Sequence, residues 1–318
     1  MRARNEESGF VLICVIWVVA LLTVITMGFN HRARLDRKAA VYSLDRDLAM
    51  AQARGAVQRG MVEVRNKYLK DLLDPNQVFS THLGQDWARE TNLLQDGEYF
   101  LPQENFDNDG VWFYIEDMER RFNVNQPRDI FEHLPQISTG ALRNIHHRLG
   151  FGGKEVLLVR QPFQAVEEVR FIRGISEEDW KGDDDKPGLR TILTTEGSGF
   201  ININTAAEEV LMSIPNFSQK IVDRVLGFRA GGDGVLNTPD DRGFRDIEDV
   251  LKTLAIEGRS AEAIKRYCTC NSNYFKITGV ATRRQGKVRA QCAAVIRLDT
   301  DFNYPPQLIS WEETPLGA

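Results

Sequence analysis

The sequence predicts an α+β protein in which a long N-terminal helix crosses a membrane and a large all-α insertion interrupts a small antiparallel sheet. Two observations carry this prediction. An apolar run continued by helical periodicity opens the chain, and two β-favouring regions flank about 150 residues of helical pattern. The 318 residues are 42% hydrophobic and 27% charged, which excludes a disordered chain and a multi-span membrane protein. The net charge of −5 provides no basic field, so we expect no nucleic-acid partner.

The first element is an apolar segment over residues 10–29. It reads FVLICVIWVVALLTVITMGF and holds 20 residues without a charge. As a helix it is about 30 Å long, which matches the hydrocarbon core of a bilayer. The alternative is a cleaved signal peptide, whose apolar core is roughly 7–15 residues long and precedes a small-residue cleavage site. Asn30, His31 and Arg32 follow the run instead, so we expect a single-pass transmembrane helix.

A short polar leader over residues 1–9 ends in Gly9, directly before Phe10. Glycine followed by phenylalanine at the start of such a helix resembles the processing site of type IV prepilins and type II secretion pseudopilins. The resemblance implies that a membrane prepilin peptidase cuts between Gly9 and Phe10 and that Phe10 becomes N-methylated. It also implies an anchor in a bacterial inner membrane and a soluble domain in the periplasm.

The distribution of basic residues opposes that orientation. Two arginines precede the apolar segment, whereas four basic residues closely follow it: Arg32, Arg34, Arg37 and Lys38. The positive-inside rule would place the more basic side, and with it the soluble region, in the cytoplasm. We follow the leader, and the conflict stays open at this point.

The helix is expected to continue beyond the membrane as an amphipathic segment over residues 30–72. No proline occurs between Phe10 and Pro75, and apolar residues recur at helical spacing. The stripe consists of Leu35, Ala39, Tyr42, Ala49, Ala53, Val57, Met61, Val64 and Tyr68. An unbroken helix to about Leu72 resembles the first helix of pilins, half in lipid and half on a globular head.

Cys14 is the fifth residue counted from Phe10. Most members of the pilin family carry glutamate there, and a carboxylate in a membrane is costly unless it is paired. In the family its partner is the N-terminal ammonium of the subunit docked ahead. The resemblance therefore implies that Cys14 marks a subunit with nothing ahead of it, at the tip of a filament. Its thiol is expected to serve as a small, lipid-compatible group.

The soluble region divides into a sheet and its insertion. Residues 73–121 form the first part of the sheet domain, with connectors and a strand over 111–116. Residues 122–267 form the helical insertion. Residues 268–318 complete the sheet with a hairpin, 274–282 and 288–298, and a last strand over 307–312.

Two sequence matches at nearly one offset indicate that the insertion is an internal repeat. FNVNQ at 122–126 matches ININT at 201–205, 79 positions on, and PFQAVEEV at 162–169 matches GFRDIEDV at 243–250, 81 positions on. We expect two modules, about 122–200 and 201–267, of a helix-hairpin-helix or SAM-like kind. The first motif is expected to form a turn that caps the start of a helix, and the second to open a helix with acids in its first turn.

The order of these features resembles the K family of type II secretion minor pseudopilins. The resemblance covers the Gly9–Phe10 site, the missing glutamate, the strand ending at Asp117, the two motifs at 202–206 and 244–250 and the 274–298 hairpin. It implies a pilin-like fold and a tip subunit that nucleates the pseudopilus with minor pseudopilins I and J and other pseudopilins. The pseudopilus would help to drive exported proteins through the outer membrane. A minor pilin of a type IV pilus is one alternative.

Another alternative is a membrane-anchored DNA-binding or DNA-uptake protein, because residues 214–229 resemble a helix-hairpin-helix element. Such elements present backbone N–H groups to phosphate from a glycine-rich turn, but the turn here is Asn216-Phe217-Ser218. The missing glycines and the acidic chain argue for a packing role instead.

One loop suits a hard cation. Its candidate ligands are Asp233, Asn237, Asp240 and Asp241 within a glycine-rich segment, and oxygen ligands of this kind suit Ca²⁺. Calcium in family members with similar heads favours binding. The spacing is not that of an EF-hand, and a solvated loop is the alternative. Residues 107–110 (DNDG) are a weaker candidate.

We expect no enzymatic activity. The sequence contains no serine–histidine–aspartate order, Walker motif or HExxH. Cys268, Cys270 and Cys292 are too few and too poorly spaced for a zinc site, and the sequence leaves open whether two of them form a disulfide.

Overall fold

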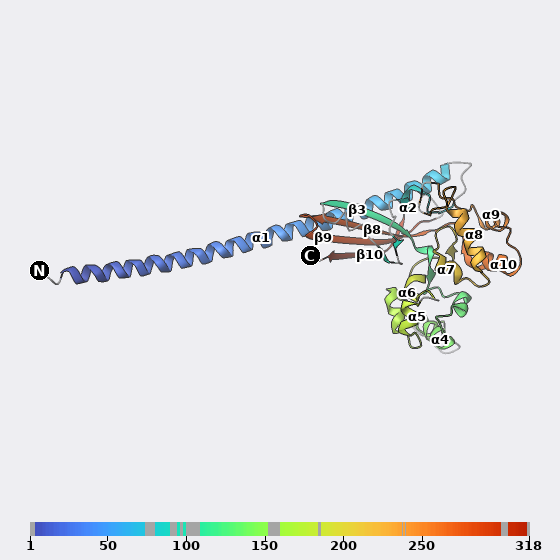
Figure 1. Ribbon diagram of the computed structural model, residues 1–318, viewed down its shortest axis with the longest axis horizontal. Helices are drawn as coiled ribbons and strands as arrows, with labels where there is room; N and C mark the ends of the chain where they lie inside the picture. Colours follow the sequence, from blue (N-terminus) through green and yellow to red (C-terminus); the bar gives the residue numbers. More distant parts are fainter. Residues whose placement is uncertain are drawn as a thin grey trace.

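A computed structural model of the chain describes residues 4–73, 80–89, 94–95, 98–99, 109–151, 160–183, 186–236, 238, 240–299 and 305–316. One long helix projects from a head that combines a sheet with two helical lobes (Figure 1). The helix, α1, runs without interruption over Arg4–Leu73, which is 70 residues or about 105 Å. The expected continuous helix is therefore present.

Only the second part of the predicted apolar stripe packs on the head. Ala49, Ala53 and Val57 are fully buried, and Val64 and Tyr68 are nearly so. Residues 10–44 are exposed along their whole length, including the earlier stripe positions Leu35, Ala39 and Tyr42. Asp45 is the first buried residue of the helix, and it forms ion pairs with Arg283 at 3.3 Å and Arg284 at 2.5 Å at the edge of the head.

The sheet has four antiparallel strands in the order β10-β9-β8-β3. Their bounds are β3 Gly110–Asp117, β8 Tyr274–Arg283, β9 Val288–Arg297 and β10 Gln307–Leu316. The predicted strand, hairpin and last strand are thus all confirmed. α1 lies against β3, β8 and β9 (Figure 1). The backbones approach closely at Gly279, where a Cβ would lie 2.4 Å from the carbonyl oxygen of Ala53, so only glycine fits there.

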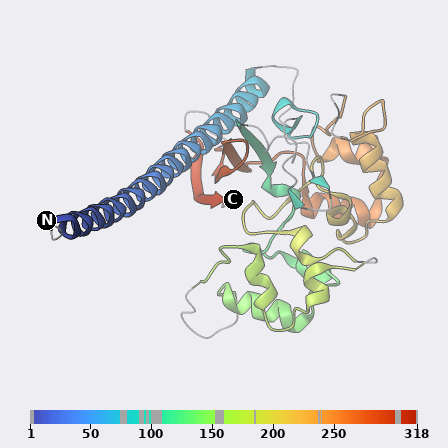
Figure 2. The same cartoon turned by 60° about the vertical axis from the view of Figure 1, so that its left-hand side comes forward.

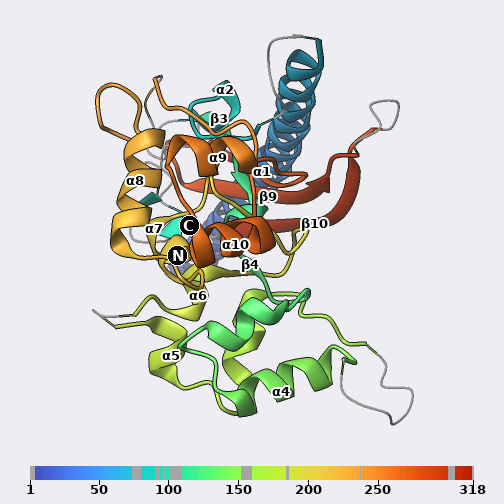
Figure 3. The same cartoon turned by 90° about the vertical axis from the view of Figure 1, so that its right-hand side faces the viewer.

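Two helical lobes follow one another between β3 and β8 (Figures 2 and 3). The first, module 1, contains β4 Phe122–Asn123, the 3₁₀ helix η2 Asp129–His133, α4 Thr139–Arg148, the 3₁₀ helix η3 Val166–Phe171, α5 Glu177–Lys181, α6 Leu189–Ile192 and β5 Leu193–Thr194. The second, module 2, contains β6 Ile201–Asn202, α7 Glu208–Met212, α8 Gln219–Arg229, α9 Ile247–Thr253, α10 Gly258–Tyr267 and β7 Cys268–Thr269. The remaining short elements are α2 Asp86–Arg89, β1 Leu94–Gln95, β2 Glu98–Tyr99 and the 3₁₀ helix η1 Met118–Arg120.

An equivalent pair of short strands closes each module. In module 1, β4 pairs in parallel with β5, and in module 2, β6 pairs in parallel with β7. These strands lie at the beginning and end of each module, so the two ends of each lobe are tied together beside the sheet. The sequence pattern did not reveal these two-residue strands, because they are too short to show an alternating pattern.

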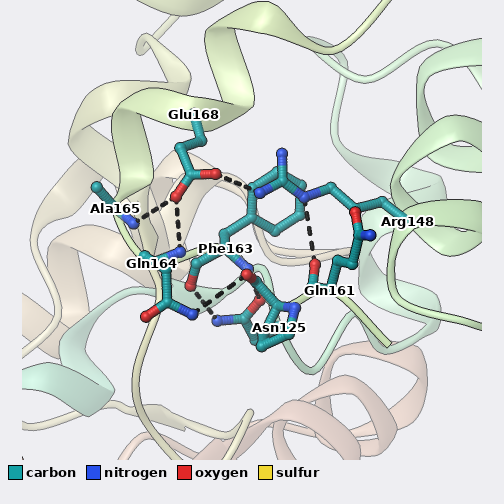
Figure 4. A network of polar contacts seen from close by, with 8 residues as sticks. Asn125, Arg148, Gln161, Phe163, Gln164, Ala165 and Glu168 are labelled. Atoms are coloured by element: carbon teal, nitrogen blue, oxygen red, sulfur yellow. Dashed lines mark hydrogen bonds and ion pairs between the residues drawn. The ribbon is translucent and has the colours of Figure 1, made fainter. Parts of the chain in front are cut away.

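The structure confirms the repeat through one shared contact. In module 1, Asn125 accepts a hydrogen bond from the backbone N–H of Phe163 at 2.7 Å and donates one to its carbonyl oxygen at 2.9 Å (Figure 4). In module 2, Asn204 does the same with Phe244, at 2.8 and 2.9 Å. In each module the asparagine carboxamide bonds both the N–H and the carbonyl oxygen of one phenylalanine, and so joins the first motif to the second.

The predicted helix-capping role of the first motif is wrong. The predicted turns are present, because Asn123 and Asn202 accept from the backbone N–H groups of Asn125 and Asn204, at 2.8 and 3.0 Å, but these turns do not cap a helix. α7 begins after Ala207, which has no side chain able to cap it.

The second motif does open a helix in both modules. Asp246 caps α9, and the acids Glu248 and Asp249 follow in the first turn. In module 1, Glu168 accepts from the N–H groups of Gln164 and Ala165, at 2.8 and 3.0 Å, and the helix that follows is a 3₁₀ helix (Figure 4).

Candidate assembly site

The N-terminal part of α1 has an apolar surface that is unfavourable in water. Among the described residues, one helix, Phe10–Lys70, is long and apolar enough to cross a membrane; its most apolar stretch of 18 residues has a mean hydropathy of 2.9 and is not buried in the head. Phe10 is 69% exposed and Trp17 73% exposed. Such a surface is unfavourable in water by about 25 cal/mol per Å² of apolar area. It fits a single-pass membrane anchor.

Gly9 and Phe10 both lie within α1, and the helix passes through the expected cleavage point. Cys14 follows Phe10 by about one helical turn and has an exposed, free thiol. After the leader, the first acidic residue of the chain is Asp36, so the apolar part of the helix holds no carboxylate at all. Cleavage at Gly9–Phe10 and the meaning of Cys14 stay predictions.

The candidate cation loop is organised by its own hydrogen bonds. Asp240 accepts from the N–H groups of Gly232 and Asp233, at 2.6 and 3.1 Å, and from the hydroxyl of Thr238 at 2.7 Å. These bonds, led by the one from Thr238, lower the pKa of Asp240 to about 2, so its carboxylate is ionised at neutral pH. Asp241 is buried and accepts from the backbone N–H of Thr238 at 3.3 Å.

The donor atoms of this loop suit Ca²⁺, but the loop is not a preformed cage. Asp233 accepts from the N–H of Val235 at 2.8 Å, and Asn237 lies outside the described residues. Across the part of the chain that the structure describes, there is no group of three or more His, Cys, Asp or Glu side chains that could hold a metal. A cation would have to draw the three aspartates together. Of the weaker candidate at 107–110, Asp107 also lies outside the described residues.

The helix-hairpin-helix element of module 2 faces its own core. The turn between α7 and α8 contains Asn216 at a φ of 63°, the left-handed conformation that such a turn requires. The hydroxyl of Ser260 donates to the carbonyl oxygen of Asn216 at 2.7 Å. At the end of α8, Arg229 is buried and donates to the carbonyl oxygen of Ala206 at 2.6 Å. This geometry uses the element for packing.

The three cysteines of the soluble region are free and buried. Burial raises the pKa of Cys268 to about 12 and that of Cys292 to about 11, and it raises the pKa of Cys270 as well. All three thiols are therefore protonated at neutral pH and unreactive as nucleophiles.

The sequence pattern did not reveal the junction that holds module 2 against the sheet. Asp117, the last residue of β3, is buried, and one of its oxygens accepts from the side chains of Asn202, Thr205 and Ser272, at 3.0, 2.5 and 2.7 Å. Its other oxygen accepts from the N–H of Glu119 at 2.8 Å. We call Asp117 and these partners the junction cluster.

Glu119 extends the junction cluster to the loop between the modules. Its carboxylate accepts from the N–H groups of Ser198 and Asn273, at 2.9 and 2.8 Å. Burial, followed by the charge of Asp117, raises the pKa of Glu119 to about 7, and burial also raises the pKa of Asp117. The sequence offered one signal for this cluster, which was the pair of acids Asp117 and Glu119 just beyond the predicted strand over 111–116.

Comparisons with known proteins address the second module and the fold separately. Residues 201–267, which are module 2 without its last strand residues, match the family model of type II secretion system protein K. The fold is similar to a chain in the crystal structure of the GspK-GspI-GspJ complex from the type 2 secretion system of enterotoxigenic Escherichia coli. The TM-score is 0.54 at 15% sequence identity, covering 90% of this chain and 100% of that chain. Both findings support a minor pseudopilin K of type II secretion. The expected pilin-like fold with a helical insertion is confirmed. A search of curated proteins gives no match.

Proposed function

We propose that this protein is the K minor pseudopilin of a type II secretion system and occupies the tip of the pseudopilus. The observation that carries the proposal is the combination of a pilin-like helix and sheet with an inserted pair of modules, the second of which matches the protein K family over residues 201–267. In this role the chain acts as a structural subunit and not as an enzyme. It nucleates the pseudopilus, which then pushes exported proteins through the outer membrane.

The shape of the head supports a tip position. The two modules lie at the end of the head that is farthest from the N-terminus of α1 (Figure 1). In a filament built from parallel α1 helices, a subunit stacked ahead would have to share that space with them. An insertion over residues 122–267 therefore allows neighbours behind it but obstructs one in front. The absence of a carboxylate near Cys14 agrees with this arrangement, because no ammonium group ahead needs a partner.

Minor pseudopilins I and J are the proposed partners, together with other pseudopilins behind them. The support is the fold similarity to a chain of the GspK-GspI-GspJ complex. Before assembly the protein would lie in the bacterial inner membrane by α1, with its head in the periplasm, after a prepilin peptidase has cut at Gly9–Phe10. The exposed apolar helix supports the anchor.

Mass spectrometry of the mature N-terminus tests the proposal. We expect a protein that begins with N-methylated Phe10, and we expect Gly9→Val to leave the leader attached because a branched side chain obstructs the cut. Gly28→Val is the matched control, since it lies in the same helix and a Cβ there has no atom within 4 Å. A mature protein that retains Met1 would contradict the assignment.

We also propose that Ca²⁺ binds the loop of Asp233, Asn237, Asp240 and Asp241. Binding only to the folded state at 100 times the dissociation constant would stabilise it by about 2.7 kcal/mol. In detergent-solubilised full-length protein we expect a higher Tm in millimolar Ca²⁺ than in chelator, and a smaller difference for Asp233→Asn. Asp183→Asn, in a separate loop, should keep the full difference. Identical melting curves with Ca²⁺ and with chelator would overturn the proposal.

A further inference from the structure

The basic segment that follows the membrane helix has no role in the fold. Arg32, Arg34, Arg37 and Lys38 are all exposed. Within the described part of the chain, the side chains of these four residues form no hydrogen bond or ion pair. From Phe10 on, the first buried residue of α1 is Asp45, which is paired with Arg283 and Arg284. The helix between Phe29 and Asp45 is therefore exposed, and its basic residues are concentrated near the membrane.

Such a segment is unfavourable in the proposed orientation. Positive charges hinder the translocation of a short flanking segment, and here the side that would be translocated is the more basic one. The four cations are also unnecessary for packing, because all four residues are exposed. A segment that opposes insertion and does not stabilise the fold requires another explanation.

The height of these residues matches the level of lipid headgroups. With a rise of 1.5 Å per residue, Arg32 lies about 5 Å and Lys38 about 14 Å beyond the end of the apolar segment at Phe29. The headgroup region is about 5–8 Å thick on each side. Helical side chains lean toward the N-terminus of their helix, which is the membrane side here, so the long side chains of Arg37 and Lys38 reach back toward the phosphates.

The charges are also arranged on one face. Arg34, Arg37 and Lys38 are spaced by three and four residues and so form a single basic face. Arg32 lies on the other side of the helix, four residues before Asp36, which offsets its charge. The next basic residue, Arg46, is about 25 Å from Phe29, well beyond a Debye length of about 8 Å. The basic face is thus confined to the membrane surface.

We propose that Arg34, Arg37 and Lys38 bind the headgroups of anionic phospholipids at the membrane surface. The inference rests on the proposed membrane anchoring of α1. Charge complementarity and depth select the lipid phosphate as the ligand. The contact holds α1 at a fixed depth before assembly, and it must break when the subunit leaves the bilayer for the filament.

Lipid selectivity of the full-length protein in vesicles tests this proposal. The protein is reconstituted in phosphatidylcholine bilayers that contain a trace of spin-labelled phosphatidylglycerol or spin-labelled phosphatidylcholine, and the fraction of immobilised label is measured. We expect a preference for phosphatidylglycerol of about fivefold or more, which corresponds to roughly 1 kcal/mol for a basic residue near an anionic surface. High salt should reduce the preference.

The triple variant Arg34→Gln, Arg37→Gln, Lys38→Gln should reduce the ratio to near one. Arg65→Gln is the control, because Arg65 is exposed on the same helix about 54 Å from Phe29. An unchanged preference for phosphatidylglycerol in the triple variant would overturn the inference. If that variant also no longer bound other pseudopilins, the basic face would be assigned to an acidic protein partner instead. Carbonate extraction of the same vesicles tests the proposed membrane anchor separately from the proposed lipid contact. Protein that carbonate extracts from the vesicles would overturn the anchor itself.

Discussion

Replacing Asp117 with alanine is expected to destabilise the protein by about 3–5 kcal/mol, the range typical of removing one partner from a buried charged network. Its carboxylate accepts four hydrogen bonds in the junction cluster, three of them from the side chains of Asn202, Thr205 and Ser272. Alanine would remove the acceptor that these buried donors share, with Asn202 keeping only its bonds to the carbonyl oxygen of Thr81 and the hydroxyl of Ser272. It would also open a small void between β3 and module 2. Module 2 should therefore detach from the sheet at lower denaturant concentration.

Equilibrium unfolding of the full-length protein in detergent, followed by tryptophan fluorescence, measures the effect. Asp117→Asn keeps the shape and one acceptor oxygen but places an amide NH2 group toward the N–H of Glu119, so we expect an intermediate loss of stability. Asp47→Ala is the control, because Asp47 is exposed on α1 and its removal should change stability by no more than about 0.5 kcal/mol. An Asp117→Ala variant as stable as this control would show that the junction cluster does not hold the modules in place.

The sequence predicted the elements that are recognisable from the length of an apolar run or from the spacing of their residues. α1 followed from an apolar run of membrane length and from the absence of proline before Pro75, and the strands of the sheet followed from runs rich in β-branched and aromatic residues. The repeat was visible because two motifs recur at nearly one offset. These signals are local, so a reading of the chain alone can recover them.

The sequence could not predict how the parts are joined. Asn202 looked like a helix cap, because asparagine before a helix often is one, but its side chain instead donates to Asp117, 85 positions earlier. The extent of the α1 stripe was also overestimated. Tyr42 has the correct spacing to pack, but α1 becomes buried against the head only from Asp45 on, and no local pattern shows where a partner element stops.

Alanine in place of Asn204 is the second substitution with a large expected effect, a loss of about 2–4 kcal/mol. Its carboxamide is fully buried and bonds both backbone groups of Phe244, and it donates to the carbonyl oxygen of Cys270 at 3.2 Å. Each buried polar group left unsatisfied costs about 1–3 kcal/mol. Asn144→Ala serves as the control, because that side chain is near the surface and donates to a single carbonyl oxygen.

The matching substitution Asn125→Ala tests whether the two modules are copies in energy as well as in shape. Asn125 bonds both backbone groups of Phe163 and donates to the carbonyl oxygen of Thr195 at 2.9 Å, so it has the same number of contacts as Asn204. Its loss should be of similar size. Hydrogen exchange then separates the modules, since the amide of Phe163 should lose protection in Asn125→Ala and the amide of Phe244 in Asn204→Ala. If either substitution exposed both amides equally, the insertion would unfold as one unit, and the repeat would describe its ancestry but not its stability.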